Sequence, residues 1–343
     1  MALINTIING DCLEKLKEFK DGSIDCCVTS PPYYGLRDYG TGKWIGGDSN
    51  CPHRRTSKYS KNTITGHAQE ELAGNVGDAI YKKVCPFCGA IREDKQIGLE
   101  ETPDEYIEKL VEVFREVKRA LKDDGTLWIN IGDTYAGISH DAERKNKDLI
   151  GIPWMLAFAL RKDGWYLRQD IIWHKPNPMP EPVKDRCVKS HEYIFLLSKK
   201  PNYYFDYEAI QEDSVCKDDR RAGDGRIAYS GKRLEGGADK TKAQQSFVVI
   251  SDKRNKRDVW SVTTKAVKEA HFATFPEELI TPCIKAGCPV GGIVLDPFFG
   301  SGTTGRVAER LNRNYIGIEL NPEYIEIGQR RTNNVQMTIE GFI

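Results

Sequence analysis

Residues 292–319 constrain the fold more than any other part of the chain. Gly292-Ile-Val-Leu-Asp296 is short and apolar, as the buried strands of parallel sheets are. A glycine-rich turn follows, then a helical pattern over 303–311 and a second apolar strand over 315–319. Two strands joined through a helix in this way run parallel in one sheet. The chain is therefore predicted to be an α/β protein with a mostly parallel sheet and helices on both faces.

The turn of this unit, Pro-Phe-Phe-Gly300-Ser-Gly302-Thr-Thr, has the features of a nucleoside site. Its glycines would let the backbone approach a ligand, and the helix start favours an anionic group. Glu319 follows Asp296 at roughly the 20-residue spacing at which such units hold ribose hydroxyls. The third glycine of the dinucleotide fingerprint and a basic residue for a pyrophosphate are missing. S-adenosylmethionine fits this pattern, and a tight turn without a ligand is the alternative.

Residues 29–34, Thr-Ser-Pro-Pro-Tyr-Tyr, follow a second apolar strand at 24–28. Proline ends a strand because it cannot donate to the ladder, so this loop is predicted at the carboxyl end of a strand, where open α/β sheets bind ligands. The Ser30 hydroxyl and the Pro31 carbonyl are acceptors, and Tyr33 offers a flat face. This combination suits holding a planar base by its amine. A strand-ending turn with two surface tyrosines is the alternative.

Strand and helix patterns alternate along much of the rest of the chain. Asp11 lies between a predicted strand at 3–8 and a helix at 12–19, where it could cap the helix or accept hydrogen bonds from a ligand amine. Thr102-Pro-Asp-Glu105 predicts the start of a helix that runs to Leu121. The other predicted elements are strands at 126–131, 167–173 and 193–197 and a helix at 152–162.

Residues 40–98 interrupt this alternation and contain the residues of a candidate metal site. Cys85-Pro-Phe-Cys88 has the spacing of a zinc knuckle, and Cys51 and His53 complete a tetrahedral set. A zinc ion would stabilise an insertion that lacks a core of its own. Four protein ligands leave no open position, so we expect a structural metal. His67 is an alternative to His53, and free thiols are the alternative to a metal.

A second interruption spans residues 211–258 and is basic. Between 220 and 257 there are eleven Lys or Arg residues against four Asp or Glu. The whole chain has 50 residues of each sign, so its net charge gives no indication for or against nucleic acid. A basic, Gly-rich segment that carries Tyr229 and Phe247 suits phosphate contacts, and a solvated loop is the alternative. The chain has no long apolar run and no basic N-terminal signal region, which predicts a cytoplasmic protein.

Together these segments resemble the amino-group DNA methyltransferases of the S-adenosylmethionine-dependent, Rossmann-like superfamily. Residues 29–34 resemble the catalytic (Asp/Asn/Ser)-Pro-Pro-(Tyr/Trp/Phe) motif, and residues 296–304 resemble the cofactor loop. Asn9-Gly-Asp11 resembles the motif before the catalytic strand, and residues 271–279 resemble the segment that covers the cofactor. The catalytic motif precedes the cofactor loop, which is the permuted order of the β group. The resemblance covers nearly the whole chain outside the two insertions.

The resemblance implies a circularly permuted Rossmann-like methyltransferase fold. Its catalytic part would comprise 1–39 and 99–210, with a target-recognition region at 211–265 and a cofactor-binding part at 266–343. The zinc-binding insertion expected at 40–98 departs from the minimal family. The implied catalytic residues are Ser30, Pro31, Pro32 and Tyr33. The implied cofactor-binding residues are Asp11, Phe275, Pro276, Asp296, Phe298, Gly300, Ser301, Gly302, Thr303 and Glu319.

The implied reaction is transfer of a methyl group to an exocyclic amine of a base flipped out of double-stranded DNA. Ser30 and the Pro31 carbonyl would orient the amine lone pair, and Tyr33 would stack on the base, so no covalent nucleophile is required. Ser at the first motif position resembles cytosine-N4 enzymes, with adenine N6 as the alternative. A cognate restriction endonuclease is the candidate partner, and the chain is expected to be a monomer or a homodimer.

Other classes of protein share parts of this pattern. A NAD(P)-dependent oxidoreductase would share the strand–helix–strand unit but leaves residues 29–34 unexplained. An RNA or protein-glutamine methyltransferase could share the cofactor loop, although the motif order argues against both. A zinc-stabilised DNA-binding protein without catalysis would explain the two insertions but not the cofactor loop.

Overall fold

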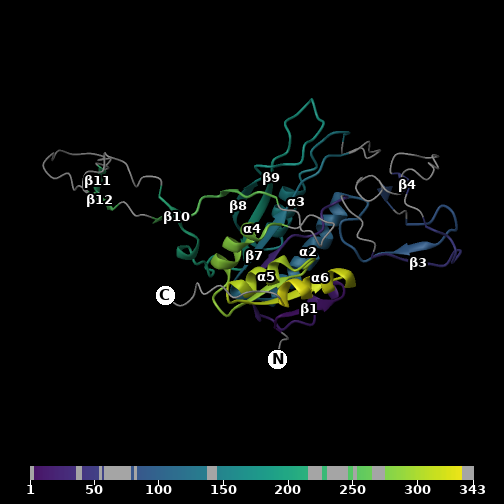
Figure 1. Ribbon diagram of the computed structural model, residues 1–343, viewed down its shortest axis with the longest axis horizontal. Helices are drawn as coiled ribbons and strands as arrows, with labels where there is room; N and C mark the ends of the chain where they lie inside the picture. Colours follow the sequence, from purple (N-terminus) through teal and green to yellow (C-terminus); the bar gives the residue numbers. More distant parts are fainter. Residues whose placement is uncertain are drawn as a thin grey trace. The chain divides into compact units, whose positions relative to one another are not determined.

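The computed structural model describes residues 4–35, 41–53, 56–57, 79–80, 83–136, 145–214, 226–229, 246–249, 253–264 and 275–333. The chain forms two compact units (Figure 1). The first comprises Met1–Phe205 and Asp258–Ile343, and the second comprises Asp206–Arg257. Within the described residues no helix is long and apolar enough to cross a bilayer.

An eight-stranded sheet forms the centre of the first unit, in the order β1-β16-β15-β2-β7-β9-β8-β14. β9 runs antiparallel to both of its neighbours, and all other neighbouring strands are parallel. The predicted mostly parallel sheet is therefore confirmed. In that order the strands are Thr6–Asn9, Asn314–Glu319, Ile293–Asp296, Ile24–Thr29, Leu121–Ile131, His191–Ser198, Tyr166–His174 and Val259–Ser261.

The central strands β15, β2 and β7 are largely buried because helices cover both faces of the sheet. All six residues of β2 are buried, which explains its nearly continuous apolar sequence. β7 begins at Leu121, five residues before the predicted start. Leu121 pairs with Ile24, the register then shifts, and Thr126 pairs with Cys26. Residues 122–124 are exposed and interrupt the apolar pattern, so the pattern did not predict this early pairing.

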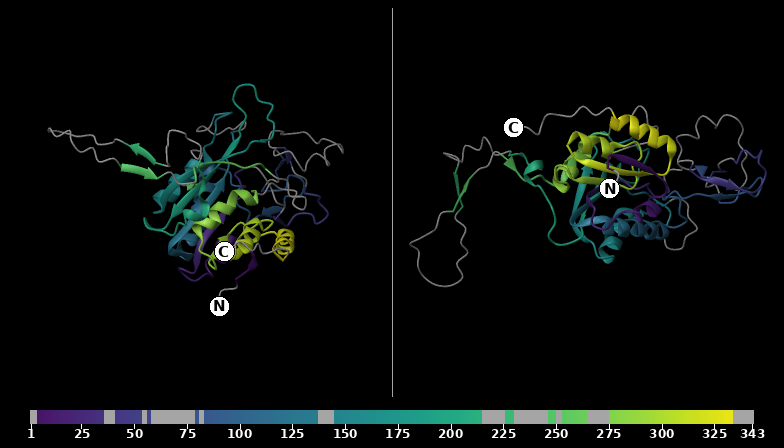
Figure 2. Two further views of the ribbon diagram at one scale, coloured as in Figure 1. Left: turned by 60° about the vertical axis from the view of Figure 1, so that its left-hand side comes forward. Right: turned by 90° about the horizontal axis from the view of Figure 1, so that it is seen from below.

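In the part of the chain that the structure describes, six α-helices lie in two groups on opposite sides of the sheet, as the right-hand view of Figure 2 shows. One group comprises α1 (Cys12–Leu16), α2 (Pro103–Ala120) and α3 (Ile152–Lys162), and the other comprises α4 (Glu277–Gly287), α5 (Thr303–Arg310) and α6 (Pro322–Asn333). The hydroxyl of Thr102 accepts a hydrogen bond of 3.2 Å from the Glu105 N–H, so α2 has the predicted cap. The predicted apolar face of α2, including Tyr106, Leu110 and Phe114, is buried.

The first insertion leaves and rejoins the sheet at adjacent points. The Gly35 N–H donates to the Gly98 carbonyl at 2.9 Å, which closes its base. Within it, β3 (Lys43–Ile45) pairs antiparallel with β6 (Ile91–Glu93), and β4 (Thr56–Ser57) pairs antiparallel with β5 (Ala79–Ile80). His67 lies outside the described residues.

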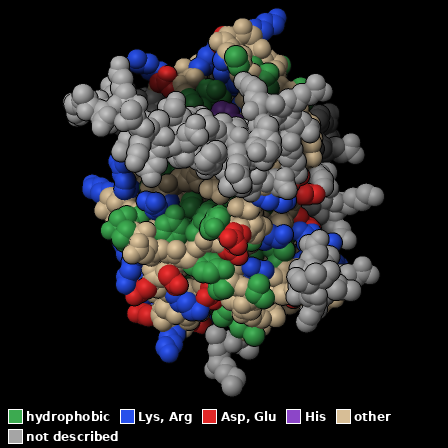
Figure 3. Space-filling view, turned by 90° about the vertical axis from the view of Figure 1, so that its left-hand side faces the viewer, with side chains coloured by type: hydrophobic (Ala, Val, Ile, Leu, Met, Phe, Trp, Pro, Cys, Tyr) green, Lys and Arg blue, Asp and Glu red, His purple; other side chains and the backbone are tan. Residues whose placement is uncertain are grey.

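Among its described residues, the second unit contains two antiparallel pairs of strands. β10 (Glu212–Asp213) pairs with β13 (Lys253–Arg254), and β11 (Arg226–Tyr229) pairs with β12 (Ser246–Val249). A short 3-10 helix spans Glu208–Ile210. Many of the basic residues predicted to contact DNA lie outside the described residues, at 220–221, 232–233, 240 and 242. Figure 3 shows one face of the molecule, and among the described side chains on this face Lys and Arg are interspersed with Asp and Glu.

Candidate functional site

The strands of the sheet bring several loops to one edge, where they line a cavity of about 440 Å³. Segments that follow β1, β15 and β2 contribute to it, as do the last residues of β16 and the end of β8. β9 runs in the opposite direction, so its second residue, Glu192, lies at the same edge. Ligands of open α/β sheets bind at this carboxyl edge.

The cavity brings together the two motifs that are far apart in the sequence. All but three of the predicted catalytic and cofactor-binding residues line it. The exceptions are Pro276, Asp296 and Gly302, and the lining residues are Asp11, Ser30, Pro31, Pro32, Tyr33, Phe275, Phe298, Gly300, Ser301, Thr303 and Glu319.

The loop after β15 depends on two glycines with left-handed backbone angles. Gly300 has φ of 52° and Gly302 has φ of 83°, and Gly302 directly precedes α5. A Cβ atom on Gly302 would come within 2.9 Å of the Gly328 Cα in α6, whereas one on Gly300 would meet no atom closer than 4.0 Å. Gly302 therefore allows α5 and α6 to approach closely. It faces α6, so it contributes to the shape of the loop although it does not line the cavity.

Asp296 is buried beneath this loop, and both of its carboxylate oxygens accept hydrogen bonds from protein groups. Its Oδ1 accepts hydrogen bonds from the Thr29 hydroxyl at 2.6 Å and the Phe298 N–H at 3.0 Å, and its Oδ2 accepts from the Thr304 hydroxyl at 2.7 Å. Burial raises the pKa of this carboxyl to about 6, although the three donors oppose the rise. The contacts connect β2, the loop and α5, and direct cofactor contact by Asp296 stays a prediction.

Glu319 and Asp11 both line the cavity and both also hold backbone groups. Glu319 Oε2 accepts from the Gly300 N–H at 2.8 Å, and its Oε1 accepts from the Asn321 N–H at 2.8 Å. Burial raises the pKa of Glu319, and these two donors oppose the rise. Asp11 caps α1 by accepting from the Glu14 N–H at 2.9 Å. The capping role predicted for Asp11 is therefore present, and its position also leaves it at the cavity wall.

Hydrogen bonds from neighbouring elements hold the Pro-Pro loop, residues 29–34, in place. The Tyr106 hydroxyl of α2 donates to the Pro32 carbonyl at 2.8 Å. The Tyr33 hydroxyl donates to Glu192 Oε2 at 2.7 Å and lies 3.3 Å from Asn130 Oδ1. Glu192 Oε1 in turn pairs with the Lys175 ammonium group. Burial, and then the nearby charge of Glu192, raise the pKa of Tyr33 well above its usual value, so Tyr33 stays a hydrogen-bond donor.

Several cavity residues were not predicted from the sequence. Asn130 and Glu192 lie at the ends of β7 and β9, and Lys175 directly follows β8, so only the folded sheet brings them together. A polar Asn inside the otherwise apolar strand at 127–131 was the one local signal. The base of the first insertion also contributes to the wall through Thr41, Lys95, Gln96 and Ile97.

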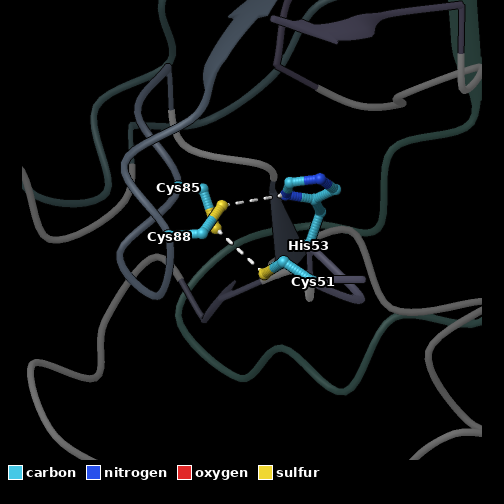
Figure 4. Close-up of side chains that lie close together, drawn as sticks. All are labelled: Cys51, His53, Cys85 and Cys88. Atoms are coloured by element: carbon cyan, nitrogen blue, oxygen red, sulfur yellow. Dashed lines mark hydrogen bonds between the residues drawn. The ribbon is translucent and has the colours of Figure 1, made fainter. Parts of the chain in front are cut away.

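The four predicted metal ligands lie together within the insertion (Figure 4). The ligand atoms of Cys51, His53, Cys85 and Cys88 all lie within 4.8 Å of one another. Cys51 Sγ is 3.8 Å from Cys85 Sγ, and Cys88 Sγ is 3.7 Å from His53 Nδ1. Tetrahedral zinc with bonds of about 2.3 Å to sulfur separates two sulfurs by about 3.8 Å, so the donor set fits this ion.

Residues 24–330 match the sequence model of the family N6_N4_Mtase, described as DNA methylase. The chain is 41% identical over 346 residues to the type II methyltransferase M.Cfr9I of Citrobacter freundii, in a match that covers 95% of this chain and 87% of that protein.

Two solved structures share the fold. That of PvuII DNA methyltransferase, titled cytosine-N4-specific, matches with a TM-score of 0.60 at 18% identity, over 98% of this chain and 89% of that one. That of TTHA0409 from Thermus thermophilus, complexed with S-adenosyl-L-methionine, matches with a TM-score of 0.55 at 21% identity, over 98% of this chain and 96% of that one.

Proposed function

The chain belongs to the N6/N4 DNA methylase family, and we propose that it transfers the methyl group of S-adenosylmethionine to an exocyclic amine of a base in double-stranded DNA. The observation that carries this proposal is the shared cavity. Ser30 and Tyr33 of the Pro-Pro loop line the same cavity as Phe298 and Glu319, which belong to the strand–helix–strand unit predicted to bind a nucleoside. A methyl donor and its acceptor must meet in one space for in-line transfer.

The cofactor half of the cavity suits a nucleoside with a charged tail. Glu319 would accept hydrogen bonds from the ribose hydroxyls, and Asp11 would accept them from the adenine amine. Phe275 and Phe298 would contact the adenine faces, and the start of α5 would favour the carboxylate of the methionyl tail. In this proposal Asp296 and Gly302 support the cofactor indirectly, by holding the loop that touches it.

The acceptor half suits an amine on a planar base. Ser30 and the Pro31 carbonyl would accept its two N–H groups, which directs the nitrogen lone pair toward the sulfonium methyl group. The base must leave the duplex to reach the cavity, and Tyr33 would stack on it. Ser30 favours cytosine N4 through its resemblance to enzymes of that kind. Adenine N6 is the second candidate.

The second unit is the candidate for target recognition. Its basic composition and its place in the sequence, between the catalytic and cofactor motifs, support contacts to DNA. The relatives named as type II methyltransferases support a further proposal, that the enzyme protects sites against a cognate restriction endonuclease.

The first insertion is the candidate for a structural zinc site. Its four ligands complete the coordination shell, so the ion would cross-link the insertion and take no part in methyl transfer. Metal analysis of purified protein should return about one zinc per chain. Cys85→Ser should lose the metal, whereas Cys187→Ser, which alters an exposed thiol elsewhere, should keep it. Protein that was never exposed to chelator and carries no zinc would contradict the assignment.

Incubation with labelled S-adenosylmethionine and unmethylated genomic DNA, followed by mass spectrometry of the nucleosides, tests the activity. We expect N4-methylcytosine. N6-methyladenine would keep the reaction class and reverse the choice of base. Label in RNA or protein and none in DNA would show that the Pro-Pro loop holds a different amine.

A further inference from the structure

The amine that accepts the methyl group must also lose a proton, and Ser30 cannot retain one. The nitrogen becomes positively charged as its bond to the methyl carbon forms, and that charge disappears only when an N–H bond breaks. An aspartate at the first position of the Pro-Pro motif could take this proton directly, whereas a serine hydroxyl must pass it on. With the proposed function as the premise, this proton needs a destination within the site.

Within the described part of the cavity wall, three carboxylates are candidates: Asp11, Glu192 and Glu319. Asp11 caps α1 and Glu319 holds the Gly300 loop, and both belong to the proposed cofactor half. Glu192 alone of the three is hydrogen-bonded to the Pro-Pro loop, through the Tyr33 hydroxyl at 2.7 Å. The Ser30 side chain acts on the same Tyr33 hydroxyl, since it lowers the pKa of Tyr33 against the rise from burial and Glu192. Ser30 and Tyr33 both line the cavity, so the oxygens of Ser30, Tyr33 and Glu192 offer a path from the cavity to the carboxylate.

Contacts on the far side hold Glu192 in place. Lys175 pairs with Glu192 Oε1, and the two side chains are only 19% and 13% exposed. The Lys175 ammonium lies 4.3 Å from the centre of the Trp173 ring, and Trp173 is itself anchored by a hydrogen bond of 2.8 Å to the Val262 carbonyl. The Asn130 side-chain amide donates to Glu192 Oε2 at 3.3 Å. These contacts leave Oε2 facing the Tyr33 hydroxyl, where a proton would arrive.

We propose that Glu192 is the proton acceptor of the methyl transfer, reached through Ser30 and Tyr33. The amine lone pair forms the N–CH₃ bond while the S–CH₃ electron pair returns to sulfur, which becomes a neutral thioether. The amine proton passes to Ser30 Oγ as the Ser30 proton passes to the Tyr33 oxygen and the Tyr33 proton passes to Glu192 Oε2. The product amine is then neutral, both hydroxyls are restored, and Glu192 holds the proton until water returns to the cavity. Lys175 and Asn130 position Glu192 for this step.

The test measures single-turnover methyl transfer with enzyme in excess over unmethylated genomic DNA fragments and with labelled S-adenosylmethionine. Glu192→Gln keeps the shape of the side chain and removes the acceptor, and Tyr33→Phe keeps the ring and removes the hydroxyl. General-base catalysis contributes about 10²-fold or more, so each variant should be slower by about this factor. Affinity for S-adenosylmethionine, measured by calorimetry, should stay within about twofold. The double variant should be no slower than either single variant, because both lie on one path.

A rescue experiment separates proton transfer from a merely structural role. Ser30→Asp places a carboxylate next to the amine and so bypasses the relay. Added to Glu192→Gln, it should recover at least about tenfold of the lost rate. The wild type should show a solvent deuterium isotope effect on the single-turnover rate that disappears in Glu192→Gln. Glu108→Gln, which alters an exposed residue of α2, is the matched control and should keep the wild-type rate and isotope effect.

The outcomes distinguish the relay from the proposed function. An active wild type whose rate is unchanged by Glu192→Gln overturns the relay and leaves the methyltransferase proposal intact. If Glu192→Gln is slow but keeps the isotope effect, and Ser30→Asp does not restore its rate, then Glu192 has a structural role. This result also overturns the relay. A wild type that binds S-adenosylmethionine but methylates no DNA overturns the proposed function, and the relay with it.

Discussion

Replacement of Asp296 by Asn tests whether this carboxylate belongs to the framework of the cavity. Asn is nearly isosteric and fits the same contacts. Its Oδ1 can accept from the Thr29 hydroxyl and the Phe298 N–H, and its Nδ2 can donate to the Thr304 hydroxyl. Thr304 can then turn its own proton toward the Val28 carbonyl, 3.5 Å away. The substitution therefore removes a buried charge. It leaves the second Nδ2 hydrogen without an acceptor among these contacts, which is a cost that does not depend on pH.

The expected gain in stability follows from the pKa. Burial raises the pKa of Asp296 from 3.8 to about 6, so the folded state disfavours the ionised form. A shift of this size corresponds to about 3 kcal/mol at 1.36 kcal/mol per pKa unit. Below pH 3.8 the carboxyl is protonated in both the folded and unfolded states, and no cost arises. Between about pH 4 and pH 6 the cost develops, and above this range it is present in full.

Denaturant unfolding of wild type and Asp296→Asn across pH 4 to 8 should reveal this dependence. We expect the stability of the variant relative to the wild type to rise by about 3 kcal/mol between pH 4 and pH 7.5. Asp170→Asn, which alters an exposed residue of β8, should show little difference at any pH. A difference between Asp296→Asn and wild type that does not vary with pH, or that shifts in favour of the wild type as the pH rises, would refute the reasoning.

Three further substitutions test single features of the site and the fold. Glu319→Gln should weaken S-adenosylmethionine binding by about tenfold or more, because hydrogen bonds to a charged group contribute about 1.5–3 kcal/mol; calorimetry that finds unchanged affinity would remove Glu319 from the cofactor site. Gly302→Ala should lower the melting temperature more than Gly300→Ala, since both strain a left-handed backbone but only the Gly302 Cβ comes within 2.9 Å of α6; equal effects would contradict the packing argument. Thr102→Ala should cost about 1 kcal/mol in thermal unfolding by removing the cap of α2, without changing cofactor affinity, and a change in affinity would show that the effect reaches the cavity.

The sequence predicted elements best where one apolar period ran without interruption. The predicted bounds of α3 are those of the structure, and the predicted end of α5 differs by one residue. The early start of β7 was missed because residues 122–124 are exposed although the strand has already begun to pair. The antiparallel direction of β9 was not predicted, because the direction of a strand depends on partners that are distant in sequence.

The cavity was predictable only where one short segment carries a complete motif. Ser30 to Tyr33 and the loop after β15 are such segments, and both line the cavity. Glu192 and Lys175 have no local motif, and their pairing forms only when β8 and β9 lie side by side. Asp296 lies at the end of its strand, where a ligand-binding acid would lie. Only the fold shows that the hydroxyls of Thr29 and Thr304 donate hydrogen bonds to it.

The closed base of the first insertion also determines which part of the chain can be exchanged. Thr41 is tied to Asp94 by a hydrogen bond of 2.7 Å, and Gly35 is tied to Gly98, so the two ends are joined independently of the metal-ligand region beyond them. In protein engineering, residues beyond this joint form a removable cassette. A short hairpin could replace them while the wall formed by Thr41 and residues 95–97 stays in place. Excision at 40 and 98 would instead delete that wall and open the cavity to water.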